Sequence, residues 1–110
     1  MEDLDLRDGL EKLKKEIDVN TYSDDYWSIA YSFLENTRPS MNKYDFLRAF
    51  QVTQLNYANQ NKEILGFQEA YERSQELLEE ILTEHFSEPI NKVYIDNQRI
   101  QESLKKILFR

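Results

Sequence analysis

Hydrophobic positions recur at helical spacing over most of this chain. Near the N-terminus, Leu6, Leu10, Leu13 and Ile17 follow one another at steps of four, three and four residues. Between residues 64 and 86, apolar residues again recur at steps of three and four, and glutamates fill the positions between them. Such steps place side chains on one face of a helix, so both segments are predicted to be amphipathic helices.

Two adjacent apolar stripes run along residues 22–34, the most aromatic part of the chain. Together they cover more than half of a helix's circumference, which places this helix at the centre of a bundle or leaves one face for a partner. Because a tyrosine hydroxyl favours a site with one wet end, Tyr22 and Tyr26, beside Asp24 and Asp25, are expected to be exposed. The residues expected in the core are Trp27, Ala30 and Leu34.

Turn and cap signals divide the remaining sequence. Pro39 predicts a break, after which Asn42 is expected to cap a third helix. Residues 59–61 favour a turn, although one long helix through them stays open because neither proline nor glycine interrupts it. Residues 90–95 are interpreted as a linker because they favour an extended chain, with a last helix starting at residue 96 or 97. The predicted fold is all-α, a single-domain bundle of four to five helices spanning residues 1–110.

Composition supports a helical fold and narrows the chemistry. The chain has only two glycines and two prolines, whereas all-β folds use many of both in turns. It has no cysteine, so disulfides, thiolate catalysis and cysteine metal sites are excluded. No apolar run approaches the roughly 20 residues that a membrane span needs, and the N-terminus lacks the pattern of a signal peptide. We therefore expect a cytoplasmic protein that does not associate with membranes.

Residues for catalysis are scarce. The single histidine, His85, would need a glutamate at position 82 to form the Glu-x-x-His pair of helical dimetal sites, and position 82 is leucine. Gly9 and Gly66 are isolated, so no phosphate-binding loop can be proposed. The sequence predicts no catalytic, cofactor-binding or metal-binding residue, and we expect a non-enzymatic protein.

The net charge of −7 concentrates in two segments. Residues 1–25 carry nine acids and four bases, and residues 62–88 carry eight acids and two bases. An acidic surface steers basic proteins towards it and repels nucleic acid, although a helical face can be acidic merely to stay hydrated. We predict an inhibitor, immunity or regulatory factor for a partner protein with a basic surface. The predicted protein-binding residues are Tyr22, Asp24, Asp25, Tyr26, Glu69, Glu72, Glu76, Glu79 and Glu80.

Two other functions stay open. The aromatic stripes would suit a structural or assembly subunit that self-associates as a homo-oligomer. A less favoured alternative is a helix-turn-helix DNA-binding regulator, whose recognition helix would carry Lys43, Tyr44, Arg48, Gln51 and Gln54. Small acidic helical bundles include immunity proteins, antitoxins and phage-encoded inhibitors. That likeness rests on size, fold class and charge, and no motif carries it.

Overall fold

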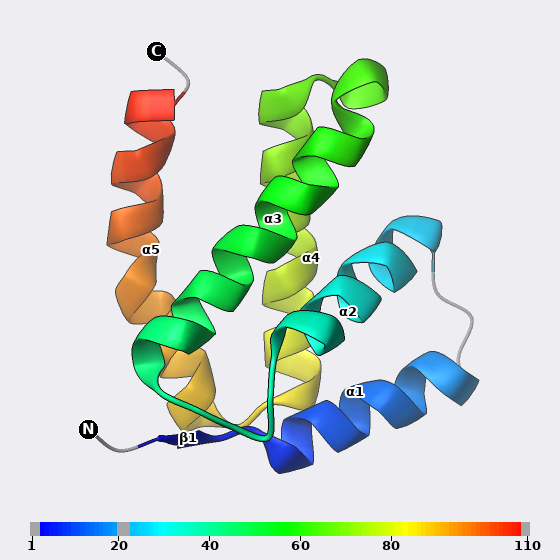
Figure 1. Cartoon of the computed structure of the whole chain (residues 1–110), viewed down its shortest axis with the longest axis vertical. Helices are drawn as coiled ribbons and strands as arrows, with labels where there is room; N and C mark the ends of the chain where they lie inside the picture. The colour runs from blue at the N-terminus through cyan, green and yellow to red at the C-terminus, as the bar shows by residue number, and fades with distance from the viewer. Residues whose placement is uncertain (1–2, 20–22, 109–110) are drawn as a thin grey trace.

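The computed structural model describes residues 3–19 and 23–108, which form five helices and one pair of very short strands (Figure 1). The prediction of an all-α bundle of four to five helices is confirmed. The elements are β1 (Leu4–Asp5), α1 (Arg7–Val19), α2 (Asp24–Asn36), β2 (Ser40–Met41), α3 (Lys43–Leu65), α4 (Phe67–His85) and α5 (Glu88–Leu108).

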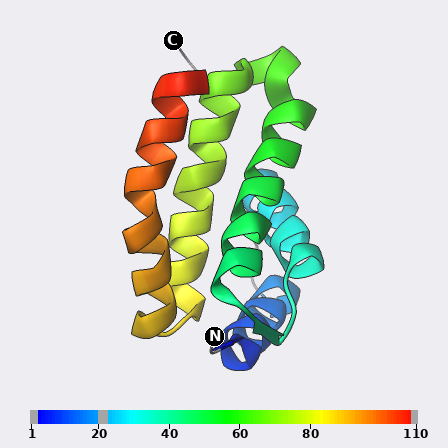
Figure 2. The same cartoon turned by 60° about the vertical axis from the view of Figure 1, so that its left-hand side comes forward.

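The two central helices, α3 and α4, form an antiparallel hairpin, and α5 runs upright beside them (Figure 2). Helix α1 lies across the end of this trio that is opposite the C-terminus, and α2 crosses further up, nearer the middle of α4 (Figure 1). Gly66 alone separates α3 from α4, with φ +83° and ψ 149°. Residues with a Cβ rarely adopt that conformation, so glycine at position 66 permits the chain to reverse between α3 and α4.

A short antiparallel β-pair ties the N-terminus to the α2–α3 connection. Leu4 pairs with Met41, and the Leu6 N–H donates to the Pro39 carbonyl at 2.8 Å. The predicted cap of α3 is confirmed, because the Asn42 side-chain oxygen accepts from the Asp45 N–H at 2.9 Å. This connection therefore fixes where α3 begins relative to α1.

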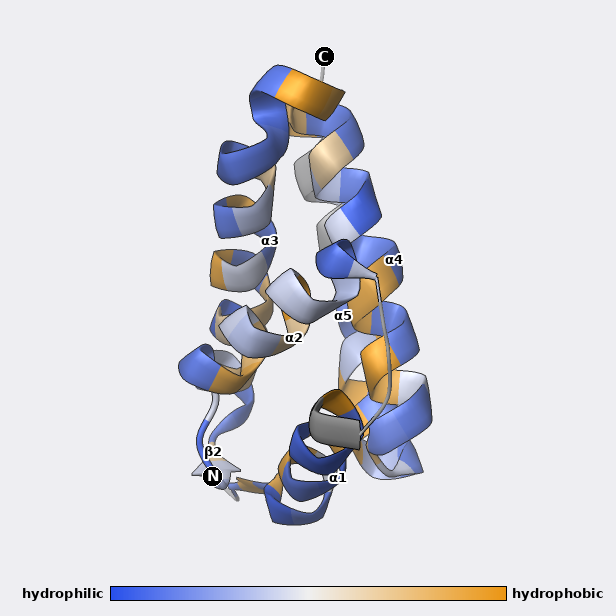
Figure 3. Ribbon diagram, turned by 90° about the vertical axis from the view of Figure 1, so that its right-hand side faces the viewer, coloured by the Kyte–Doolittle hydropathy of each residue, from blue (hydrophilic) through white to orange (hydrophobic). Residues whose placement is uncertain are grey.

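A cluster of phenylalanines forms the centre of the core. Phe33 of α2 lies with its ring centroid 5.3 Å from that of Phe50 of α3 and 5.9 Å from that of Phe86 at the end of α4. Phe46 packs 4.9 Å from Phe50, and Phe50 in turn contacts Tyr94 of α5 at 5.3 Å. In Figure 3 hydrophobic segments recur along α3 and α4 and alternate with hydrophilic ones.

Two predicted interruptions of helices are wrong. Residues 59–61 lie inside α3, where the Asn61 side-chain amide donates to the Tyr57 carbonyl at 2.9 Å, and the helix ends only at Gly66. Residues 90–95 lie inside α5, which starts at Glu88. The Ser87 carbonyl accepts from the Ile90 N–H at 3.1 Å and opens this helix, and a proline in a first turn loses no intrahelical bond.

The expected orientation of α2 is also wrong. Tyr26 is only 4 % exposed, and it is buried together with Ile29, Ala30 and Phe33. Trp27 and Leu34, expected in the core, are only partly buried. Either apolar stripe of α2 is hydrophobic enough to face the core. Packing against α3 and α4 buries the stripe formed by Tyr26, Ile29 and Phe33.

Gly9 lies directly beneath the Phe86 ring, where a methyl group would overlap ring carbons. We expect Gly9→Ala to lower the free energy of unfolding by up to about 2 kcal/mol, because overpacking costs about 1–3 kcal/mol and the better helix propensity of alanine offsets only ~1 kcal/mol of it. Urea unfolding followed by Trp27 fluorescence measures this change. Lys12→Ala, exposed on the same helix, is the control. When Phe86 is first replaced by leucine, Gly9→Ala should lower the free energy of unfolding by less. An equal decrease in the Phe86→Leu protein would show that overlap with the Phe86 ring is not the cause.

Gln54 is fully buried one turn after Phe50 on α3, and neither polar atom of its amide has a hydrogen-bond partner among the described residues. An unsatisfied buried polar group costs about 1–3 kcal/mol. We therefore expect Gln54→Met, which nearly conserves volume, to raise the free energy of unfolding by about that amount. Gln51→Met, exposed on the same helix, should change it by less than about 0.5 kcal/mol. A loss of stability in Gln54→Met would show that the amide is satisfied in solution.

Candidate protein-binding face

Helix α4 separates its buried stripe from a row of carboxylates. The stripe includes Leu78 and Ile81, which are fully buried. Glutamates occupy the remaining positions at steps of three and four, so their carboxylates run along the outer side of the helix. These residues are Glu69, Glu72, Glu76, Glu79, Glu80 and Glu84.

The fold brings Asp25 of α2 to this row. A hollow of about 340 Å³ is lined by Asp25 together with Glu69, Glu72 and Glu76, and by Leu65 and Arg73. A second hollow of about 400 Å³ follows along α4 and is lined by Glu76, Glu79, Glu80, Thr83 and Glu84. Glu76 borders both hollows, so we treat them together as the acidic groove.

Few cations of the chain itself neutralise the acidic groove. Arg73 forms an ion pair with Glu76 at 3.3 Å. Among the described residues, Asp25, Glu69 and Glu72 form no ion pair. Negative charge is therefore left available to a partner at the end of the groove that Asp25 joins.

Glu79 differs from its neighbours because it holds α5. Its Oε1 accepts from the Gln98 side-chain amide at 2.8 Å and from the Tyr94 hydroxyl at 3.3 Å. Part of its acceptor capacity is thus used inside the molecule. Glu79 remains at the edge of the acidic groove, but we assign it a role in positioning α5 as well.

Neither tyrosine of the predicted protein-binding site is found on the surface formed by the described residues. Tyr22 lies outside the described residues, and the expectation that Tyr26 is exposed is wrong because its ring is buried. The exposed tyrosines are Tyr31, at 49 %, and Tyr44, at 69 %. The predicted set of protein-binding residues left out Glu84, although spacing places it in the row of glutamates one turn beyond Glu80, and it lines the groove.

Tyr57 lies beneath Asp25 and is 2 % exposed. Burial, together with the hydrogen bonding and negative charge of the nearby Asp25 carboxylate, raises the pKa of its phenol to about 12. The contact is loose, since the hydroxyl lacks a hydrogen bond of good geometry among the described residues. The Asp25 charge therefore sits against a neutral, buried phenol.

The described residues do not form a metal site, and the single histidine is buried. No group of three or more histidine, cysteine, aspartate or glutamate side chains among them could hold a metal ion. His85 is buried, with its Nδ1 3.2 Å from the Ile81 carbonyl oxygen, so the ring packs against its own helix. Gln54, one of the five side chains that a helix-turn-helix would use, is also buried and unable to reach a base.

Comparison with known proteins leaves the function to be argued from the chain itself. No protein-family model, curated protein or solved structure matches it significantly. Within the described part of the chain, none of the helices combines the length and apolarity that crossing a membrane requires.

We expect Tyr57 to make the fold sensitive to alkali. A phenol whose pKa rises on folding from 10.0 to about 12 stabilises the fold fully below pH 10, and this stabilisation is lost as the pH rises through about 12. Tyr57→Phe should therefore lose less stability than the wild type between these pH values. Urea unfolding across this range measures the difference. Tyr44→Phe on the same helix is the control. If Tyr57→Phe loses as much free energy of unfolding as the wild type over this pH range, Tyr57 is not the group responsible.

Proposed function

We propose that this chain is a cytoplasmic, non-enzymatic protein-binding domain that inhibits or regulates a partner protein with a basic surface. The observation that carries this proposal is the meeting of Asp25 with Glu69 and Glu72 around one hollow, without ion-pair partners among the described residues. The two carboxylate clusters are more than 40 residues apart in the sequence, and the fold joins them.

Electrostatic steering is the expected mechanism of capture. A concave surface lined by one sign of charge raises association rates by about 10- to 1,000-fold at low ionic strength. Contacts between exposed charges add only about 0–1 kcal/mol each, so the acidic groove contributes more to the association rate than to the lifetime of the complex. Regulation would follow because the bound domain covers the basic surface of its partner.

The partner should be captured by the tagged protein at low salt and released at high salt. We then expect Glu69→Lys with Glu72→Lys to lower the association rate at least tenfold, because it reverses the field at the hollow. Surface plasmon resonance at several salt concentrations measures that rate. Screening should narrow the difference between wild type and variant as salt rises.

The matched control reverses two exposed carboxylates of α1, Asp8→Lys with Glu11→Lys, and changes the net charge equally. If both double variants slow association to the same extent, total charge rather than the acidic groove controls binding. If the tagged protein retains only further copies of itself, the self-associating function replaces this proposal.

A further inference from the structure

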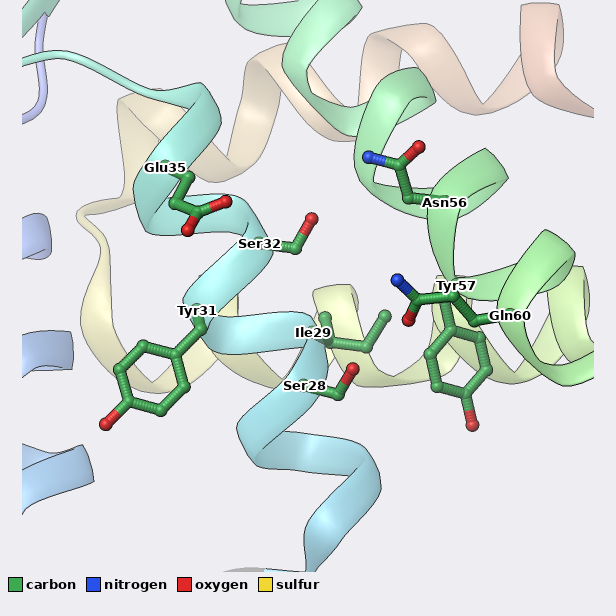
Figure 4. A pocket seen from close by; sticks show the side chains of 8 residues that line it. All are labelled: Ser28, Ile29, Tyr31, Ser32, Glu35, Asn56, Tyr57 and Gln60. Carbon is green, nitrogen blue, oxygen red and sulfur yellow. The ribbon is translucent and has the colours of Figure 1, made fainter.

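Apart from the acidic groove, a less charged hollow lies between α2 and α3. It has a volume of about 280 Å³. Three of its lining residues, Ser28, Ser32 and Glu35, project from α2 at helical spacing, and Figure 4 shows Ser28 and Ser32 pointing towards the side of Asn56 and Gln60 of α3. Polar side chains of α2 and of α3 therefore line opposite sides of this hollow.

These polar groups do not satisfy one another. Ser28, Glu35, Asn56 and Gln60 form no hydrogen bond or ion pair among the described residues. Within the described part of the chain, Ser32 alone of the polar lining residues of α2 has a hydrogen-bond partner, because the Asn36 side-chain amide donates to its hydroxyl at 3.4 Å and also to the Thr53 hydroxyl of α3 at 3.5 Å. The remaining hydrogen-bonding capacity is free for a ligand, and rigid helices hold it in place.

The residues that line the hollow favour a ligand that is positively charged and donates hydrogen bonds. Hydroxyl, amide and carboxylate oxygens can all accept hydrogen bonds, and Glu35 is the one ionised group among the lining residues. Lys14 of α1 borders a neighbouring hollow with Glu35, but no ion pair joins them. A ligand that brings several donors and one positive charge would match both the oxygens and the charge.

The volume limits the size of the ligand. Sites for drug-sized molecules usually enclose about 300–1,000 Å³, so this hollow lies just below that range. A single side chain of a protein is a better match than a cofactor. Lysine offers three donors around one point, whereas arginine carries five donors in a planar fork that can reach acceptors on two opposed walls.

We propose that the α2–α3 hollow receives an arginine side chain of the partner protein. The guanidinium would donate to Glu35 and Ser32 on one wall and to the side-chain oxygens of Asn56 and Gln60 on the other. This inference rests on the proposed function for the identity of the ligand as part of a basic partner. The two sites adjoin, because Tyr57 lines this hollow and its hydroxyl lies beside Asp25 of the acidic groove.

The test uses a small probe and needs no partner. N-acetyl-arginine amide is titrated into the whole protein, and the side-chain amide signals of Asn56 and Gln60 are followed by NMR. We expect these signals to shift with a millimolar dissociation constant, and to shift much less with the citrulline analogue, which has the same shape without the charge. Glu35→Gln should weaken binding by roughly fivefold, the effect of one exposed charge pair. Glu11→Gln on α1 is the control and should bind the probe as the wild type does.

Three results would overturn the inference. These are equal binding of the lysine analogue, probe-induced shifts confined to the carboxylates of α4, and wild-type affinity in Glu35→Gln. None of them depends on whether Glu69 and Glu72 steer a partner. A failed capture experiment therefore counts against the proposed function, and a failed titration counts against the arginine site alone.

Discussion

One aromatic cluster holds all five described helices together. Phe33 comes from α2, Phe46 and Phe50 from α3, and Phe86 from the end of α4. Tyr94 attaches α5 through Phe50, and α1 approaches the cluster because Gly9 leaves room for the Phe86 ring. Aromatic side chains bury large areas and prefer tilted or edge-on contacts, so a few of them can fix the relative angles of several helices. The cluster thus fixes how α2 crosses α3 and α4. The acidic groove and the α2–α3 hollow both depend on this crossing.

The same cluster explains why the surface is acidic where it is. Once α4 has turned its apolar stripe towards the phenylalanines, its remaining positions must face outwards, and most of these positions are glutamates. The N-terminal end of α2 is brought to this side because Phe33, further along the same helix, is held between α3 and Phe86. Asp25 thus reaches the α4 row as a geometric consequence of core packing. Its charge is not balanced there, since Arg73 pairs with Glu76.

The sequence predicted the elements whose signals are local and failed where the outcome depends on tertiary contacts. Helical periodicity identified α1 and α4, and Asn42 was recognised as the cap of α3. The end of α3 was misplaced because amide side chains that favour turns can equally hydrogen-bond within a helix, as Asn61 does. The facing of α2 was misjudged because two apolar stripes compete, and only the positions of α3 and α4 decide between them. The row of glutamates could be predicted from spacing, whereas its union with Asp25 and the α2–α3 hollow could not, since both join residues distant in the sequence.

The acidic groove and the α2–α3 hollow would contribute differently to recognition, the first through charge and the second through the geometry of its hydrogen bonds. Long-range attraction from the acidic groove acts on any basic surface and selects weakly among partners, because it depends on net field rather than on hydrogen-bond geometry. A hollow with acceptors on opposed walls distinguishes a guanidinium from an ammonium, because unpaired acceptors penalise the wrong cation. Tyr57 lines the α2–α3 hollow and its hydroxyl lies beside Asp25, so the two sites are neighbours. A partner drawn in by the groove would then be retained only if it places an arginine in the neighbouring hollow.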